Sequence, residues 1–160
     1  EMDQLLKAAG GIISSVPSNE IYAAMQTGSL DAAITSSTSL ISFRLQEISK
    51  NVTSGINGSF WFMMEPLLMS KAIFDALPAA QQKAIAEVGA EMEPFALEQA
   101  KADDKRLADI YAKAGVAVHE FDAAALDQWK AIARDTAWKD FAARNATCAG
   151  LLKLAEKTPA

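Results

Sequence analysis

The chain has 160 residues, of which 51% are apolar and 22% charged, the balance of a globular protein rather than of a disordered one. Its formal net charge is −5 and its lysines and arginines are scattered, which excludes nucleic acid as an expected partner and disfavours a membrane surface. Its longest apolar run, residues 60–64, is far too short to span a bilayer. A single cysteine, Cys148, excludes an internal disulfide and indicates a small buried residue.

The first residues predict a helix that ends at a glycine pair. Met2, Leu5 and Leu6 have helical spacing, and Gly10 follows within one turn. Glu1 is not an initiator methionine, so we expect the chain to begin inside an element, with polypeptide missing upstream. The two isoleucines after the glycines, residues 12–13, predict a short strand.

The next two elements predict an α/β unit. A helix is expected from Pro17, with Ser18 or Asn19 as its cap, and Gly28 as its end. A short strand is expected over residues 30–34. Alternation of helix and strand in such short units indicates an α/β fold with a parallel sheet, in which ligands bind beyond the carboxyl ends of the strands.

A cluster of hydroxyl side chains follows that expected strand. Six of the eight positions from 35 to 42 are serine or threonine: Thr35, Ser36, Ser37, Thr38, Ser39 and Ser42. One or two of them could cap a helix, and the surplus could line a polar cavity for an anionic ligand. Both interpretations remain open from the residues alone.

The middle of the chain predicts a helix over 40–49, a turn at Asn57-Gly58, and a long buried strand over 60–69. A short helix then follows from Ser70 and is closed by Leu77-Pro78.

The second half predicts almost only helices. One helical tract covers 79–114, and Pro94 should kink or split it before Gly115 ends it. Residues 116–118 predict a brief extended piece. Asp122 is expected to cap a helix that continues through Trp138 and Phe141, and the last helix covers 149–157.

Catalytic chemistry is weakly supported by these residues. His119 is the only histidine, so a serine nucleophile in the hydroxyl cluster would lack a base, and a hydrolase fragment would need one from outside the chain. One histidine and one cysteine exclude the usual zinc sites, and neither phosphate-binding glycine motif occurs. We expect no enzyme, no metal and no cofactor.

Residues 16–32 carry a resemblance to a known family. They match, in order, the segment P-x-x-E-h-Y-x-A-h-Q-x-G-x-h-D-[AG] of the DctP-like periplasmic solute-binding proteins of TRAP transporters, where h is apolar. The resemblance continues at residues 47–50, at Leu77-Pro78 and at Gly115-Val116. It is tight to residue 50 and loose from 120 on.

This resemblance implies the carboxyl-terminal half of a type II periplasmic-binding-protein-like fold. Residues 1–58 would be part of the second α/β lobe, 59–70 a crossing hinge strand, and 71–160 the long helix and terminal helices packing across both lobes. The parent would carry a signal peptide and lie in the periplasm of a Gram-negative-type bacterium. It would bind a small organic acid, carboxylate or sulfonate, and deliver it to the membrane permease subunits.

The resemblance also suggests ligand-binding positions. Ser18 and Thr35 occupy two positions that face the ligand in the family, and both are smaller than the family's usual residues there. Ile34 and Thr35 stand where a metal-dependent branch has Glu-Trp, which argues against a bound metal ion. The arginine that pairs with the ligand in the family would lie upstream of Glu1. Further expected ligand contacts are Asn19, Ser36, Ser37, Asn57 and Trp61.

A second hypothesis concerns the long helix alone. A helix of this length could present a surface to a protein partner or to a second copy, which would make the chain a dimerisation or interaction module. The two hypotheses are compatible, because some receptors of the family dimerise through this helix. A melting temperature that rises with ligand favours the receptor, and one that rises only with protein concentration favours the module.

Overall fold

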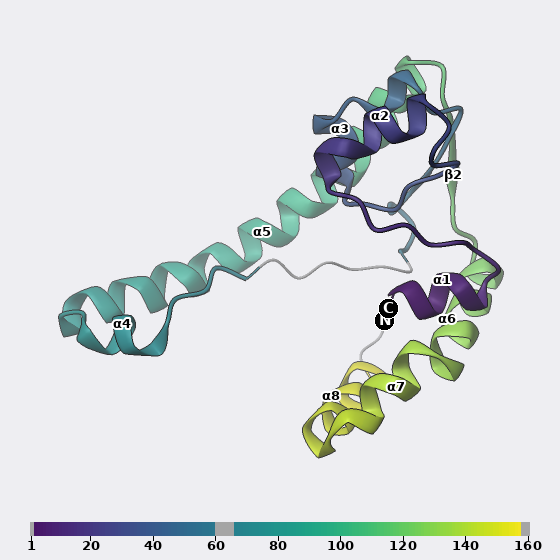
Figure 1. The fold of residues 1–160 in the computed structure, drawn as a ribbon. Coiled ribbons are helices and arrows are strands. Elements are labelled where there is room, and N and C mark those ends of the chain that lie inside the picture. The colour runs from purple at the N-terminus through teal and green to yellow at the C-terminus, as the bar shows by residue number, and fades with distance from the viewer. Residues whose placement is uncertain (1, 60–65, 158–160) are drawn as a thin grey trace.

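The longest helix of the described residues is α5 (Ala79–Lys113), which has 35 residues and runs from α4 to the group of elements around the strands. Figure 1 shows the computed structural model, which describes residues 2–59 and 66–157. The carboxyl-terminal end of α5 packs in the group that contains α2, α3 and the strands, and its amino-terminal end extends away beside α4. The other helices are α1 (Met2–Ala8), α2 (Ile21–Gln26), α3 (Ser37–Ser42), α4 (Lys71–Ala76), α6 (Ala123–Asp135), α7 (Ala137–Arg144) and α8 (Ala146–Ala155).

Pro94 does not split α5. A proline inside a helix removes one backbone hydrogen bond. The surrounding sequence is rich in alanine, glutamate, leucine and methionine, which have high helix propensity, and the helix continues through the proline. The predicted end of α5 at Gly115 is confirmed, since this glycine has a φ of 80° directly after the last helical turn.

Two short parallel strands, β1 (Asn51–Ser54) and β2 (Ala117–Glu120), form the sheet of the described residues. Their register pairs Asn51 with Ala117 and Thr53 with His119. Side chains of β1 alternate in burial, so Val52 and Ser54 are buried while Asn51 and Thr53 are exposed on the other face. The buried face packs toward α5. The expected extended piece after Gly115 is confirmed as β2, whereas β1 was not predicted.

The core joins α5 to the elements around the sheet. Leu107 and Tyr111 of α5 are 1% and 0% exposed, and they pack with four other buried side chains: Ile21, Leu45, Val52 and Val116. The Tyr111 hydroxyl donates a hydrogen bond to the carbonyl of Leu40 at 3.2 Å, which ties α3 to the long helix. The neighbouring Ser54 is 1% exposed, and its hydroxyl has no hydrogen-bond partner among the described residues.

Two expected strands are absent from the structure. Residues 12–13 and 30–34 form no regular element, and the side chain of Ile12 is fully exposed. A strand is stabilised by hydrogen bonds to a neighbour, and the described part of the chain offers these segments none. The long strand expected over 60–69 falls partly outside the described residues, and its described part, 66–69, has no strand pairing.

Helix boundaries differ from expectation where the backbone leaves the helical region. The helix expected over 40–49 is divided, because Arg44 has a φ of 55° and separates α3 from a 3-10 turn at Leu45–Glu47. Thr136 divides the expected helix that contains Trp138 into α6 and α7. Neither Ser18 nor Asn19 caps α2, which begins instead through a 3-10 turn at Ser18–Glu20.

Most local start and stop signals are confirmed. Gly10 and Gly28 follow α1 and α2 with φ values of 91° and 74°. The Ser70 hydroxyl accepts a hydrogen bond from the backbone N–H of Ile73 and caps α4. Asp122 caps α6, accepting from the N–H of Ala125 at 2.7 Å.

Tyr111 generates a prediction about alkaline stability. Burial raises its pKa to about 12, above the value of 10.0 expected for an exposed tyrosine. Folding therefore favours the neutral phenol, a contribution that is complete below pH 10 and is lost as pH rises through about 12. In Tyr111→Phe, we expect the free energy of unfolding to fall by about 1 kcal/mol at pH 7 and to depend less steeply on pH above 10. Urea unfolding between pH 7 and 11.5 measures both effects.

The partly buried Tyr22 supplies the control for this experiment. Its hydroxyl binds the Glu47 carboxylate, and that hydrogen bond, with desolvation and the negative charge, raises its pKa as well. Tyr22→Phe should leave the contribution of Tyr111 in place. Equal pH dependence in the Tyr111→Phe variant and the unsubstituted protein would contradict the role given to burial.

Candidate functional site

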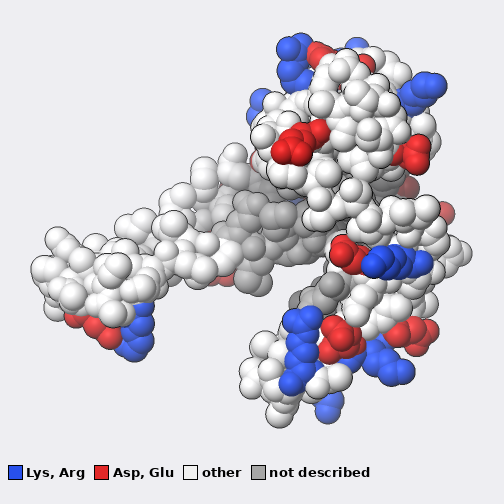
Figure 2. All heavy atoms as spheres, in the orientation of Figure 1, with Lys and Arg blue, Asp and Glu red and all other residues white. Residues whose placement is uncertain are grey.

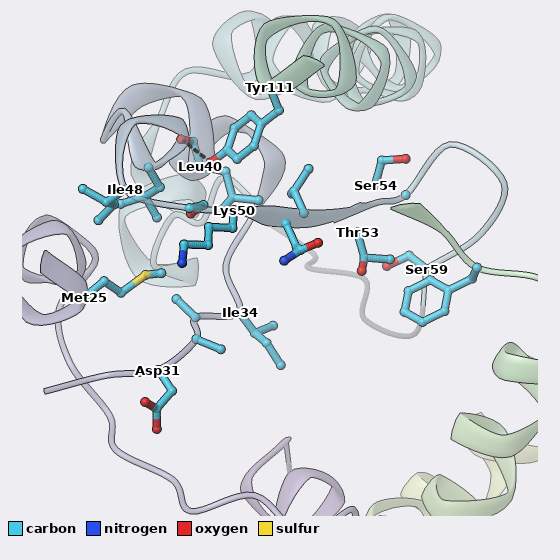
Figure 3. A pocket seen from close by; sticks show the side chains of 18 of the residues that line it. Met25, Asp31, Ile34, Leu40, Ile48, Lys50, Thr53, Ser54, Ser59 and Tyr111 are labelled. Atoms are coloured by element: carbon cyan, nitrogen blue, oxygen red, sulfur yellow. Dashed lines mark hydrogen bonds between the residues drawn. The ribbon is translucent and has the colours of Figure 1, made fainter. Parts of the chain in front are cut away.

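A cavity of about 750 Å³ lies between the segment 31–34 and the exposed face of β1 (Figure 3). Segment 31–34 forms one wall, and residues 48–55 form the facing wall. The remaining described lining residues are Met25, Leu40, Leu45, Ser59, Tyr111, Phe121 and Trp129. The cavity therefore lies next to the segment that leads to the hydroxyl cluster.

Few charged groups line this cavity. Lys50 contributes the one cation and Asp31 the one carboxylate among its described lining residues. Figure 3 shows the Lys50 side chain extending from the start of β1 toward Met25. Thr53 and Asn51 add polar groups, and the Asn51 side-chain oxygen already contacts His119 Nε2 at 2.9 Å. Lys50 and the neutral polar groups are the features of this lining that suit a small anion, and the Asp31 carboxylate opposes one.

The lining residues include no pair of groups suited to covalent catalysis. Ser54 and Ser59 are hydroxyls without a histidine in the lining, and His119 contacts Asn51 from outside it. Within residues 2–59 and 66–157, no group of three or more potential metal-ligating side chains comes together.

Two predicted ligand contacts in the cluster, Ser36 and Ser37, have structural partners. Ser36 caps α3, its hydroxyl accepting a hydrogen bond from the backbone N–H of Ser39 at 3.2 Å and contacting the Thr38 hydroxyl at 2.9 Å. Ser37 donates to a carboxylate oxygen of Asp104 on α5 at 2.5 Å. Capping and tethering therefore account for these two residues, which do not line the cavity.

Thr35 differs from its neighbours in the cluster. It is half-buried, follows the cavity-lining Ile34, and its hydroxyl has no hydrogen bond to any described residue. An uncommitted hydroxyl at the end of a cavity wall can still turn toward a ligand. Of the three predicted contacts in this cluster, Thr35 is the one whose hydroxyl is free to serve that role.

The other predicted ligand contacts either lie away from the cavity wall or fall outside the residues that the structure describes. Ser18 and Asn19 are exposed in the 3-10 turn before α2. Asn57 follows β1 and donates a hydrogen bond from its amide to the Glu120 carboxylate at the end of β2. Trp61 lies outside the described residues. None of the six described candidates lines the cavity, and their contact with a ligand stays a prediction.

Sequence reasoning missed the residues on β1 because it missed the strand. Asn51, Thr53 and Gly55 line the cavity from that strand and the turn after it. The segment Asn-Val-Thr-Ser is four residues long and alternates a polar residue with Val52 over too few positions to be recognised. Lys50 could have been found from the sequence, because it is the last residue of the segment 47–50 that resembles the family.

Comparisons with known proteins extend over almost the whole chain. The family model described as bacterial extracellular solute-binding protein, family 7 (DctP), matches residues 2–145. A solute-binding protein of Albidiferax ferrireducens is 58% identical over 99% of this chain and 47% of its own length. A solute-binding protein of Verminephrobacter eiseniae is 29% identical over 74% of this chain and 35% of its own length.

A solved structure shows the same architecture. The crystal structure of a TRAP periplasmic solute-binding protein from Rhodoferax ferrireducens, with bound malonate, superposes with a TM-score of 0.89 at 58% identity. The match covers 98% of this chain and 49% of that one. The chain thus spans about half the length of the relatives it matches.

The fold is that of part of a periplasmic-binding-protein-like solute-binding protein. The chain belongs to bacterial extracellular solute-binding protein family 7. Across its described parts, no helix is both long and apolar enough to cross a membrane.

The cap of α3 provides a test of the hydroxyl cluster. Ser36→Ala removes the oxygen that accepts the Ser39 N–H, and loss of such a cap costs about 1 kcal/mol of stability. We expect a lower melting temperature with ligand affinity unchanged within about twofold, measured by calorimetry. Ser42→Ala is the matched control, because it removes an exposed hydroxyl from the last position of the same helix and leaves the Ser36 cap in place. A large loss of affinity in Ser36→Ala at unchanged stability would assign Ser36 to the ligand instead.

Proposed function

We propose that this chain is part of a TRAP-type periplasmic receptor that binds a small organic acid anion and delivers it to the membrane permease. The observation that carries the proposal is the likeness, at 58% identity and a TM-score of 0.89, to a solved receptor with bound malonate. Malonate is a dicarboxylate, and the cavity wall offers the Lys50 ammonium and neutral polar groups, which suit carboxylates, together with the single carboxylate of Asp31.

In this proposal two groups of the chain act on the ligand. The Thr35 hydroxyl donates a hydrogen bond to a carboxylate oxygen, and the Lys50 ammonium supplies positive charge from the facing wall. The family resemblance implies that an arginine outside this chain forms the bidentate hydrogen bond with the ligand carboxylate. Neither group transfers a proton, since the task is recognition and release.

The proposed arrangement of the receptor is the one that the family resemblance of the sequence implies. Residues 1–58 contribute to one α/β lobe, 59–70 cross to the other, and the helices of 71–160 pack across both. The exposed apolar side chains of α5, including Ile85, Val88 and Met92, supply surface for such packing. Closure of the lobes on the ligand is the working motion. The receptor is placed in the periplasm of a Gram-negative-type bacterium.

Malonate tests the proposal directly in the full-length protein that contains this sequence. We expect malonate to raise the melting temperature, because a ligand at 100 times its dissociation constant stabilises by about 2.7 kcal/mol. Malonamide, which keeps the shape of malonate and lacks its charge, serves as the control. Isothermal titration calorimetry gives the affinity of each.

One result would contradict the receptor and favour an interaction module on α5. The side chains Ile85, Val88, Met92 and Phe95 repeat at three- and four-residue intervals and are 43–55% exposed, as in a helix face that takes a protein partner. If no carboxylate or sulfonate of two to six carbons changes the melting temperature, while sedimentation velocity shows concentration-dependent dimers, the module is the better proposal.

Thr35 provides a second prediction within the site. Thr35→Trp places a bulky ring at the end of the cavity wall and removes the uncommitted hydroxyl, so we expect malonate affinity to fall at least about tenfold. The melting temperature of the unliganded protein should change little, because the hydroxyl has no partner among the described residues. Thr38→Trp, at an exposed position of the same cluster, is the matched control. Equal affinity in both variants would exclude Thr35 from the site.

A further inference from the structure

A contact across 67 residues of sequence joins the hydroxyl cluster to the long helix. The Ser37 hydroxyl donates to Asp104 Oδ1 at 2.5 Å, the short separation typical of a hydrogen bond to a charged oxygen. Ser37 is the first residue of α3, immediately after the capping Ser36 and two residues after Thr35. A hold on Ser37 therefore limits the position of the whole segment 35–37.

The same carboxylate lies against the turn that follows β1. A Cβ atom built on Gly55 would be 3.1 Å from Asp104 Oδ2 and 3.3 Å from its Cγ, closer than most real Cβ contacts. Gly55 is not among the residues with positive φ, so its conformation does not require glycine. A side chain at position 55 would therefore have to push the Asp104 carboxylate from its place.

Asp104 thus connects both walls of the cavity without being part of either. Gly55 lines the cavity directly, and Ser37 lies three residues after the lining Ile34. Asp104 itself is not a lining residue and projects from α5. The bond from Tyr111 to the carbonyl of Leu40 holds the later part of α3 on the same helix, so α3 has two polar tethers to α5.

We propose that Asp104 is a positioning residue for ligand binding: its carboxylate, held between Ser37 and Gly55, fixes the Thr35 segment at a set distance from the β1 wall. The proposal rests on the proposed function, with Thr35 as a ligand contact. Ligand affinity then depends on a carboxylate that never touches the ligand. Because the Ser37 hydroxyl already donates its hydrogen bond to Asp104, Ser37 holds its segment in place and does not donate to the ligand.

Four variants of the full-length receptor test this role, with malonate as the ligand. Asp104→Ala and Ser37→Ala each remove the tether, and malonate affinity should fall about tenfold in both. The double variant should lose no more than either single one, because the same interaction is already gone. Asp104→Asn should restore affinity to within about threefold, since its amide oxygen still accepts the Ser37 proton.

Gly55→Ala disturbs the same hydrogen bond between Ser37 and Asp104 from the turn after β1. Its new methyl group displaces the carboxylate while both hydrogen-bonding side chains remain, so it should weaken affinity in the same direction. Asp109→Ala is the matched control, because it removes an exposed carboxylate from the same helix, and it should bind malonate normally. Melting temperatures of the unliganded proteins are recorded for every variant.

The outcomes separate positioning from simple stabilisation. Lower melting temperatures with unchanged malonate affinity in Asp104→Ala and Gly55→Ala would overturn the proposal and leave Asp104 a purely structural role. If Asp104→Ala fails to fold, the comparison of Asp104→Asn with Gly55→Ala decides the same question. If the unsubstituted receptor binds neither malonate nor related acids, the proposed function fails and this inference fails with it. Normal binding by the unsubstituted protein and by Asp104→Ala rejects only the inference.

Discussion

Burial of the last turns of α5 is the constraint on which the described structure depends. Leu107 and Tyr111 are almost wholly removed from solvent, and they contact elements that are distant in sequence, from α2 to the segment after Gly115. The Tyr111 hydroxyl also carries the hydrogen bond to the carbonyl of Leu40. With α5 fixed in this way, β1 and β2 lie side by side and α3 is set at the edge of the cavity. The candidate site is therefore built by the carboxyl-terminal end of α5 and the segments that pack against it.

The sequence predicted those features that are determined locally. Glycines after α1, α2 and α5 and the cap residues Ser70 and Asp122 act within one helical turn, so they can be recognised without a tertiary structure. Strands depend on partners, and the two expected near the start lack them among the described residues. The strand that does form, β1, is stabilised by β2, which lies 66 residues later in register, and by packing on α5. No local signal carries that information.

The family was predictable where the site was not. The segment 16–32 identified the class because many of its positions match in order, whereas the hydroxyl cluster allowed two interpretations. In the structure the hydroxyls of Ser36 and Ser37 support α3, whereas the Thr35 hydroxyl has no hydrogen bond to a described residue. Asp104 was overlooked because an aspartate among lysines on a helix is typical of a solvated face. Its partner, Ser37, is recognised only once α3 is packed on α5.

The uneven burial of α5 has a consequence for how the helix opens. Its amino-terminal half carries apolar side chains that remain about half exposed, from Ile85 to Phe95, while its carboxyl-terminal half holds the core. A stretch of helix with few tertiary contacts has marginal stability of its own. In the isolated chain, amide protons of the first half should then exchange with deuterium through fraying of that half alone. Amides around Leu107 and Tyr111 should exchange only when the whole core unfolds, so one continuous helix contains two regions of local stability.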